Sequence, residues 1–223
     1  KFEEHNAQSS VRKATHVKTK IRNVFVTGGA NGIGSAIVRN MRMAGHNVAF
    51  CDIDEAAGQA LSAITGTLFL KANVCQPSEL IGVLNTIAER WGSLDILINN
   101  VGISAFSPLT QTTIETFDEV VNTNVRPIFI TSRYMAQMRQ EKPIQYGRII
   151  NIASMYWLVG NKIAPSTPYH AAKGGVVNLT RALAAEWGKH KITVNAICPG
   201  YFYTPLTRET LDSDFFQANA KAF

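Results

Sequence analysis

The chain has 223 residues, of which 46% are apolar and 17% charged, and its mean hydropathy is close to zero. These values exclude a disordered chain and a chain built from membrane spans. The polar N-terminus lacks the apolar segment of a signal peptide. Three widely spaced cysteines, Cys51, Cys75 and Cys198, exclude a disulfide framework and a cysteine-ligated zinc site. We therefore expect a globular protein of the reducing cytoplasm, with no metal centre.

The net charge is +6 at pH 7, and half of this excess lies at the N-terminus. Residues 1–20 hold five Lys or Arg residues against two Glu, and the other residues carry 17 basic and 14 acidic side chains. Because the body has no dense basic stripe, we expect neither nucleic acid nor a membrane as a partner. We interpret residues 1–20 as a solvated basic extension and residues 21–223 as one domain; an arm that contacts a partner is the alternative.

From residue 21 onward, short apolar runs alternate with helical segments, which predicts βαβ units and a parallel sheet. The pattern indicates strands over residues 23–27, 48–52, 68–72, 94–99, 148–153 and 192–197, and helices over 32–44, 55–63, 77–91, 125–138 and 169–187. Thr112 and Glu115 have the spacing of a capping box before a further helix. The strands lack strict alternation, so we predict a doubly wound α/β fold with helices on both faces of the sheet.

Residues 27–34 (TGGANGIG) form a glycine-rich turn between the first predicted strand and the first predicted helix. A helix N-terminus presents free N–H groups and a partial positive charge, which suit a pyrophosphate. Glycines permit the tight turn and a close approach of the backbone. The turn therefore predicts a dinucleotide site, and a glycine-rich turn without a ligand is the alternative.

Asp52 ends the second predicted strand, 18 residues after Gly34. A carboxylate at this position can accept hydrogen bonds from both hydroxyls of an adenosine ribose, and it would repel a 2′-phosphate. A basic residue just before Gly32 could offset that repulsion, but the position holds Asn31. Both features favour NAD over NADP as the cofactor. A surface carboxylate at a strand end is the alternative.

Tyr169 and Lys173 are four residues apart in a predicted helix, so their side chains share one face. An ammonium group beside a phenol favours the phenolate and lowers the phenol pKa from about 10. A tyrosine tuned in this way can exchange a proton with an alcohol or carbonyl oxygen. Such a pair also occurs by chance, so it needs support from other segments.

Polar residues supply this support at the ends of several predicted strands. Ser154 follows the fifth strand, where its hydroxyl could bond the same substrate oxygen as Tyr169. The segment NNVG (residues 99–102) ends the fourth strand, Asn124 lies just inside a helix, and PGYFYT (residues 199–204) follows the sixth strand. The carboxyl ends of parallel strands line the ligand crevice of such folds.

In this order, the segments resemble the short-chain dehydrogenase/reductase family over residues 22 to about 205. The resemblance implies a single-domain Rossmann-like fold and a homo-oligomer, dimer or tetramer, with contacts through the helices at 125–138 and 169–187. It implies Tyr169 as general acid/base, Lys173 as its tuning residue and ribose ligand, Ser154 as the group that polarises the substrate oxygen, and Asn124 as the holder of a relay water. The cofactor-binding residues it implies are Gly28, Asn31, Gly32, Ile33, Gly34, Asp52, Asn73, Val74, Asn100, Gly102, Tyr169, Lys173, Pro199, Gly200 and Thr204.

Three departures from the family pattern stand out. Asn73 replaces the usual Asp near the adenine, and we expect its amide oxygen to accept a hydrogen bond from the adenine amine. The interval from Ser154 to Tyr169 is two residues longer than usual, which keeps Ser166 as an alternative to Ser154. The family pattern continues past strand six into a lid and a seventh strand. If the sequence is a partial chain, which we expect, residues 205–223 belong to the lid; the alternative is that the last strand is absent and strand six is an open edge.

The sequence thus predicts an NAD-dependent oxidoreductase that acts on a small-molecule secondary alcohol or ketone. The substrate stays open between a polyol or sugar, a hydroxysteroid and a 3-hydroxyacyl group. The alternative is a dinucleotide-sensing or scaffold protein on the same fold, but such proteins usually lose the Ser, Tyr or Lys that this chain retains.

Overall fold

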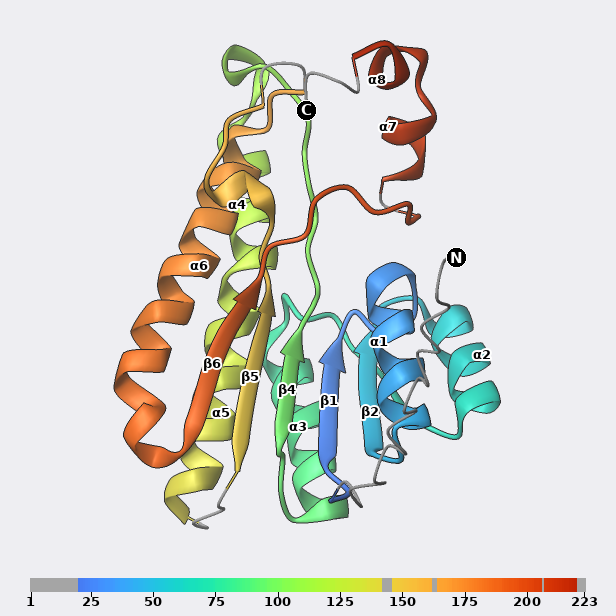
Figure 1. The fold of residues 1–223 in the computed structure, drawn as a ribbon, viewed down its shortest axis with the longest axis vertical. Coiled ribbons are helices and arrows are strands. Elements are labelled where there is room, and N and C mark those ends of the chain that lie inside the picture. Colours follow the sequence, from blue (N-terminus) through green and yellow to red (C-terminus); the bar gives the residue numbers. More distant parts are fainter. Residues whose placement is uncertain (1–19, 142–145, 162–163, 206, 220–223) are drawn as a thin grey trace, which may run out of the picture.

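The computed structural model describes residues 20–141, 146–161, 164–205 and 207–219 (Figure 1). The predicted extension over residues 1–20 lies outside these ranges except for Lys20. The described strands form one parallel sheet in the order β3-β2-β1-β4-β5-β6. They are β1 (Asn23–Thr27), β2 (Asn47–Asp52), β3 (Leu68–Lys71), β4 (Ile96–Asn99), β5 (Gly147–Ile152) and β6 (Ile192–Ile197). The helices are α1 (Gly32–Met43), α2 (Glu55–Thr65), α3 (Pro77–Trp91), α4 (Ile114–Asn124), α5 (Arg126–Glu141), α6 (Thr167–Trp187), α7 (Arg208–Asp212) and α8 (Asp214–Asn219).

Helices cover the two faces of the sheet and bury a separate apolar cluster on each (Figure 1). Val24 and Val26 of β1 pack with residues of α1 and α2, whereas Phe25 points to the other face and packs with residues of α3 and α5. Side chains alternate along a strand, so a central strand is apolar throughout when both of its faces are covered. This confirms the predicted Rossmann-like, doubly wound α/β fold.

Strand β6 departs from the expected pattern. Along β6, Ile192 and Val194 are buried, but Thr193, Asn195 and Ile197 are exposed. In the described residues, the helices cover only one face of β6. The strand lies at the edge of the described sheet.

The predicted capping box at Thr112 and Glu115 is also wrong. Thr113 caps α4, and its hydroxyl oxygen accepts a hydrogen bond from the Thr116 N–H at 3.1 Å. Thr112 instead ends a short 3-10 turn (Leu109–Gln111), and its hydroxyl lies 2.7 Å from that of Ser107. Helix α4 therefore begins at Ile114, one residue later than the predicted capping box implies.

A buried chain of polar side chains connects α5 to α6 through the sheet. The Thr131 hydroxyl of α5 donates to the Asn99 amide oxygen at 2.8 Å, and the Asn99 amide nitrogen donates to Asn151 at 2.8 Å. The Asn151 amide nitrogen then donates to the Thr180 hydroxyl of α6 at 2.9 Å. All four side chains are buried. Because Asn99 and Asn151 are register partners on β4 and β5, the chain fixes both helices against one point of the sheet.

We predict that Asn151→Ala lowers the free energy of unfolding by about 2–4 kcal/mol, because it leaves a donor on Asn99 and an acceptor on Thr180 unpaired in the core. Urea denaturation measures the change. Thr193→Ala, at an exposed position of β6, is the control and should cost less than about 0.5 kcal/mol. Equal losses in the two variants would contradict this role of the polar chain.

Candidate active site

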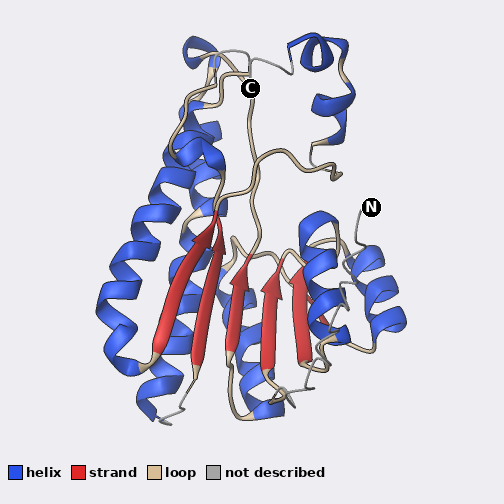
Figure 2. Cartoon of the chain, viewed as in Figure 1, coloured by secondary structure: helices blue, strands red, loops and turns tan. Residues whose placement is uncertain are grey.

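A cavity of about 450 Å³ opens at the carboxyl ends of the strands, where the arrowheads in Figure 2 point. Strand β1 pairs with β2 on one side and β4 on the other, so the loops after β1 and β4 diverge and leave this crevice. Twelve of the predicted cofactor-binding residues line the cavity: Gly28, Asn31, Gly32, Ile33, Asp52, Asn73, Val74, Asn100, Gly102, Tyr169, Lys173 and Thr204. Prediction from the sequence missed other lining residues, of which Ile53, Ala72, Cys75 and Thr123 adjoin predicted ones and could have been found from that proximity.

The glycine-rich turn forms the floor of the cavity beneath α1. Gly28 and Gly32 have φ angles of +65° and +52°, which favour glycine. Asn31 precedes α1, and its side chain makes no capping hydrogen bond. The N–H groups in the first turn of α1 are therefore available to a ligand. Gly34 does not line the cavity: a Cβ there would lie 1.9 Å from the Gly28 carbonyl oxygen, so Gly34 allows α1 to pack on the turn.

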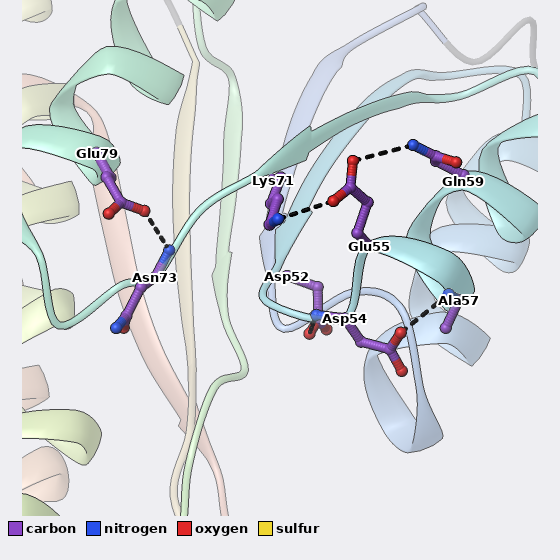
Figure 3. Close-up of polar contacts among 8 residues, drawn as sticks. All are labelled: Asp52, Asp54, Glu55, Ala57, Gln59, Lys71, Asn73 and Glu79. Atoms are coloured by element: carbon purple, nitrogen blue, oxygen red, sulfur yellow. Dashed lines mark hydrogen bonds and ion pairs between the residues drawn. The ribbon is translucent and has the colours of Figure 1, made fainter.

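Asp52 lines one part of the cavity, and the carboxylates of Asp54 and Glu55 belong to the same group of polar contacts, called here the acidic corner (Figure 3). The Asp52 carboxylate accepts hydrogen bonds from the N–H groups of Ala30 and Asp54, at 3.0 and 3.1 Å. Asp54 in turn accepts from the Asn31 side chain at 3.0 Å. Lys71, the register partner of Asp52 on β3, forms an ion pair with Glu55 at 2.7 Å. The basic group next to Asp52 is therefore already paired with another carboxylate.

Tyr169 and Lys173 meet at the other end of the cavity, on the first turns of α6. Lys173 is buried, its ammonium group donates to the Ile152 carbonyl at 2.8 Å, and it lies 5.5 Å from the centroid of the Tyr169 ring. Ser154 follows β5, and Tyr169, Ser154 and Gly200 line a second cavity of about 70 Å³. Tyr169 thus stands between the two cavities.

Burial dominates the electrostatics of this pair. It lowers the pKa of Lys173 to about 8. It also raises the pKa of Tyr169 above its usual value, although a hydrogen bond with the Ser154 side chain acts in the opposite direction. The expected lowering of the Tyr169 pKa by Lys173 is therefore wrong for the structure as it stands. The physical reason is that the ammonium group bonds the Ile152 carbonyl rather than the phenol oxygen.

Asn124 ends α4 beside the cavity and carries an unsatisfied acceptor. Its amide nitrogen donates to the carbonyls of Val120 and Ile103 at 2.8 and 2.9 Å, while its buried amide oxygen has no partner among the described residues. A Cβ on Gly102 would lie 2.6 Å from this oxygen and 3.2 Å from the Lys173 ammonium nitrogen. Such an acceptor beside a buried ammonium group fits a site that a polar ligand or water completes.

Besides Gly34 and Asn124, three predicted residues lie outside the main cavity, and one alternative is disfavoured. Ser154 and Gly200 line the second cavity, and Pro199 lines neither; its carbonyl accepts from the Met155 N–H at 3.0 Å. Ser166 is buried, bonds the Ala105 carbonyl and lines neither cavity. The geometry therefore favours Ser154 over Ser166 as the partner of Tyr169.

A series of ring contacts borders the second cavity. The Tyr156 ring makes T-shaped contacts with the Tyr169 ring, at a centroid distance of 6.4 Å, and with the Tyr201 ring, at 6.1 Å. The hydroxyl oxygens of Tyr156 and Tyr201 lie 2.5 Å apart. The Tyr201 ring also packs on Phe216 of α8 at a centroid distance of 5.0 Å. Tyr156 and Tyr201 line this cavity, whereas Tyr203 is exposed.

A parallel sheet with a glycine turn under a helix, an acidic corner and a Ser-Tyr-Lys group defines a class of protein, the dinucleotide-binding oxidoreductases. The family model for short chain dehydrogenases matches residues 22–214. The chain therefore belongs to the short-chain dehydrogenase/reductase family. It is an oxidoreductase of a family that uses nicotinamide dinucleotide cofactors and acts on small molecules.

Individual relatives agree with this assignment. The D-beta-hydroxybutyrate dehydrogenase of Rhizobium meliloti is 33% identical over 200 residues, which cover 85% of this chain and 75% of that protein. The L-fucose dehydrogenase of Mus musculus is 36% identical over 189 residues, 83% of this chain and 67% of that protein. The crystal structure of a short-chain type dehydrogenase/reductase from Mycobacterium marinum superposes with a TM-score of 0.82 at 29% identity, over 88% of this chain and 78% of that one.

Two further properties of the described residues bear on function. Within the described ranges, no helix combines the length and apolar character that a membrane crossing requires. The same residues hold no group of three or more His, Cys, Asp or Glu side chains arranged to bind a metal ion.

We predict that the stability contribution of Lys173 depends on pH. Its pKa is about 8 in the folded chain and near 10.5 when unfolded, so between these values the unfolded chain binds more protons and the free energy of unfolding rises with pH. Relative to Lys173→Met, the wild type should gain on the order of 2 kcal/mol from pH 8 to 10.5. Urea denaturation at both pH values tests this. Lys189→Met, which removes an exposed lysine, should show no such gain.

Proposed function

We propose that the protein transfers a hydride reversibly between NAD(H) and a secondary alcohol or ketone. The observation that carries this proposal is the position of Tyr169, which lines both the larger cavity and the smaller cavity that holds Ser154. Polar groups for a dinucleotide line the larger cavity, and a substrate oxygen in the smaller cavity would lie beside the hydroxyl groups of Ser154 and Tyr169. When bound, the nicotinamide cofactor supplies or accepts the hydride.

The side chains around Tyr169 account for the proton transfer. The Tyr169 phenol is a proton donor near neutral pH, as a phenol ordinarily is, so it can give its proton to a substrate carbonyl oxygen while Ser154 holds that oxygen in place. The Lys173 ammonium group stabilises the phenolate that results. The unsatisfied amide oxygen of Asn124 can accept from a water that returns a proton toward Lys173.

The acidic corner supports NAD rather than NADP. In our proposal, the first turn of α1 holds the pyrophosphate and Asp52 accepts from the adenosine ribose hydroxyls. The carboxylates of Asp54 and Glu55 lie near Asp52, and Lys71 already forms an ion pair with Glu55 (Figure 3). A 2′-phosphate would meet these carboxylates, and Lys71, the cation next to Asp52, is already engaged in that ion pair.

Substrate, assembly and location complete the proposal. The relatives named above act on a hydroxy acid and on a sugar, so we keep the substrate at the level of a secondary alcohol or ketone. We propose a homo-oligomer with contacts through α5 and α6, where a groove includes the half-exposed Phe129 and Trp187. We also propose that the protein acts in the cytoplasm, as its cysteine content predicts.

We predict that Tyr169→Phe lowers kcat by at least about 100-fold and changes the Kd for NAD less than about twofold, because it removes the proton donor and keeps the ring. Steady-state kinetics and isothermal titration calorimetry measure the two effects. Tyr134→Phe, which removes a hydroxyl bonded to Asn85 away from both cavities, should leave both values unchanged. An undiminished kcat in the Tyr169→Phe variant would contradict the role of Tyr169 as proton donor, whereas NAD binding without turnover in the wild type would favour the sensor alternative.

We predict that NAD at about 100 times its Kd stabilises the chain by about 2.7 kcal/mol, which corresponds to a rise in Tm of about 5–10 °C, and that the same concentration of NADP gives a smaller shift. Differential scanning fluorimetry measures both shifts. A larger shift with NADP would contradict the role proposed for Asp52.

A further inference from the structure

Tyr156 contacts both of the residues whose hydroxyl groups take part in the proposed reaction. It lies in a short 3-10 turn (Met155–Trp157) that Ser154 caps, and it is 8% exposed. Its main-chain N–H donates to the Ser154 hydroxyl oxygen at 3.3 Å. Its ring makes the T-shaped contact with the Tyr169 ring, at a centroid distance of 6.4 Å. One buried residue therefore meets Ser154 through its main chain and Tyr169 through its side chain.

The Tyr156 ring is itself held by other rings. It packs on the His170 ring at a centroid distance of 4.7 Å, and His170 is fixed because its Nδ1 donates to the Ser166 carbonyl at 2.7 Å. The Tyr201 ring makes a further contact with Tyr156 at 6.1 Å. Among the described residues, no second aromatic ring is paired with that of Tyr169. The surface that limits the movement of the Tyr169 ring is therefore a fixed one.

The Tyr156 hydroxyl is anchored by the loop that follows the 3-10 turn. The Asn161 amide oxygen accepts from the Ala164 N–H at 3.0 Å, so the amide nitrogen is the group that faces Tyr156. That nitrogen donates to the Tyr156 hydroxyl oxygen at 2.7 Å. The same hydroxyl lies 2.5 Å from that of Tyr201, in the segment after β6. The hydroxyl group thus joins Tyr156 to two segments, while the ring contacts Tyr169.

We propose that Tyr156 is a positioning residue whose ring sets where the Tyr169 phenol stands between the two cavities. The inference rests on the proposed function, in which Tyr169 gives its proton to the substrate oxygen and Ser154 holds that oxygen. Proton transfer needs the donor within hydrogen-bond distance of the acceptor, and a displacement of about 1 Å can cost about 100-fold in rate. Helix α6 fixes the Tyr169 backbone, but its ring can turn about the side-chain bonds into the space that Tyr156 fills.

Three variants separate the ring from the rest of the turn. Tyr156→Leu removes the ring, and Tyr156→Phe keeps the ring and removes the hydroxyl. Both keep the main-chain N–H that bonds Ser154. Trp157→Leu is the matched control, because it removes the next aromatic ring of the same turn. That ring packs on Arg181 at 5.3 Å and lines neither cavity.

The first measurement needs no substrate. NMR of protein labelled with ¹³C at the tyrosine Cζ follows the titration of Tyr169, whose signal is absent from Tyr169→Phe. Burial raises the pKa of Tyr169, so loss of the neighbouring ring, which admits water, lowers that pKa. We expect Tyr169 to titrate at a lower pH in Tyr156→Leu than in the wild type, by about half a pH unit or more. Tyr156→Phe and Trp157→Leu should titrate as the wild type does.

The second measurement is the kinetic assay used for Tyr169→Phe, with the same substrate. Tyr156→Leu should lower kcat at least about tenfold, because the proton donor is displaced. It should change the Kd for NAD less than about twofold, since Tyr156 does not line the larger cavity. Tyr156→Phe and Trp157→Leu should keep kcat within about threefold of the wild type.

The outcomes distinguish this inference from the proposed function. A Tyr169 titration that is unchanged in Tyr156→Leu or shifted in Tyr156→Phe, or an equal loss of kcat in both variants, would overturn the inference. NAD binding and turnover by the wild type would then still support the proposed function. Failure of the wild type to bind NAD would instead overturn the proposed function, and the NMR titration would still decide whether the Tyr156 ring positions Tyr169.

Discussion

The position of β1 between two parallel neighbours is the constraint on which the rest of the molecule depends. The turn after β1 is tied to both sides of the crevice. The N–H groups of Gly28 and Gly29 donate to the Cys51 carbonyl on β2, and the Asn100 side chain, after β4, donates to the Thr27 and Gly28 carbonyls. These hydrogen bonds hold the turn after β1 from two sides, through β2 and through the loop after β4. Its shape in turn sets where α1 begins and where phosphate groups can approach the backbone.

Helix α6 joins the chemistry of the site to the rigidity of the core. Lys173 and Thr180 are seven residues apart, two helical turns, and so lie on the same face of α6. Thr180 is bound through Asn151 and Asn99 to α5, while Lys173 bonds the end of β5. The same polar face of α6 thus binds the helix to the sheet through Thr180 and holds the buried Lys173 ammonium group at the cavity. A shift of the helix along its axis would break both sets of bonds at once.

Features that depend on local residue pattern and on the order of segments along the chain could be predicted from the sequence. The glycine turn, the strand ends and the spacing of Tyr169 and Lys173 placed twelve residues at one cavity. It did not reveal the Thr131-Asn99-Asn151-Thr180 chain, because those bonds depend on strand register and helix placement. The sequence also did not predict the direction of the Tyr169 pKa shift, which follows from burial. Nor did it predict the orientation of the Asn73 amide, which follows from the Cys75 N–H two residues away. Patterns of residue type locate functional groups, and three-dimensional contacts decide which of their atoms remain available.

The ring contacts from Tyr169 through Tyr156 and Tyr201 to Phe216 have a consequence for how this protein can diversify. Each ring packs on the next, so Tyr169 and helix α8 belong to one packed unit. A substitution that moves Phe216 therefore acts on Tyr169 through Tyr201 and Tyr156. With the role of Tyr169 proposed above, a change in the second cavity would alter selectivity and turnover together.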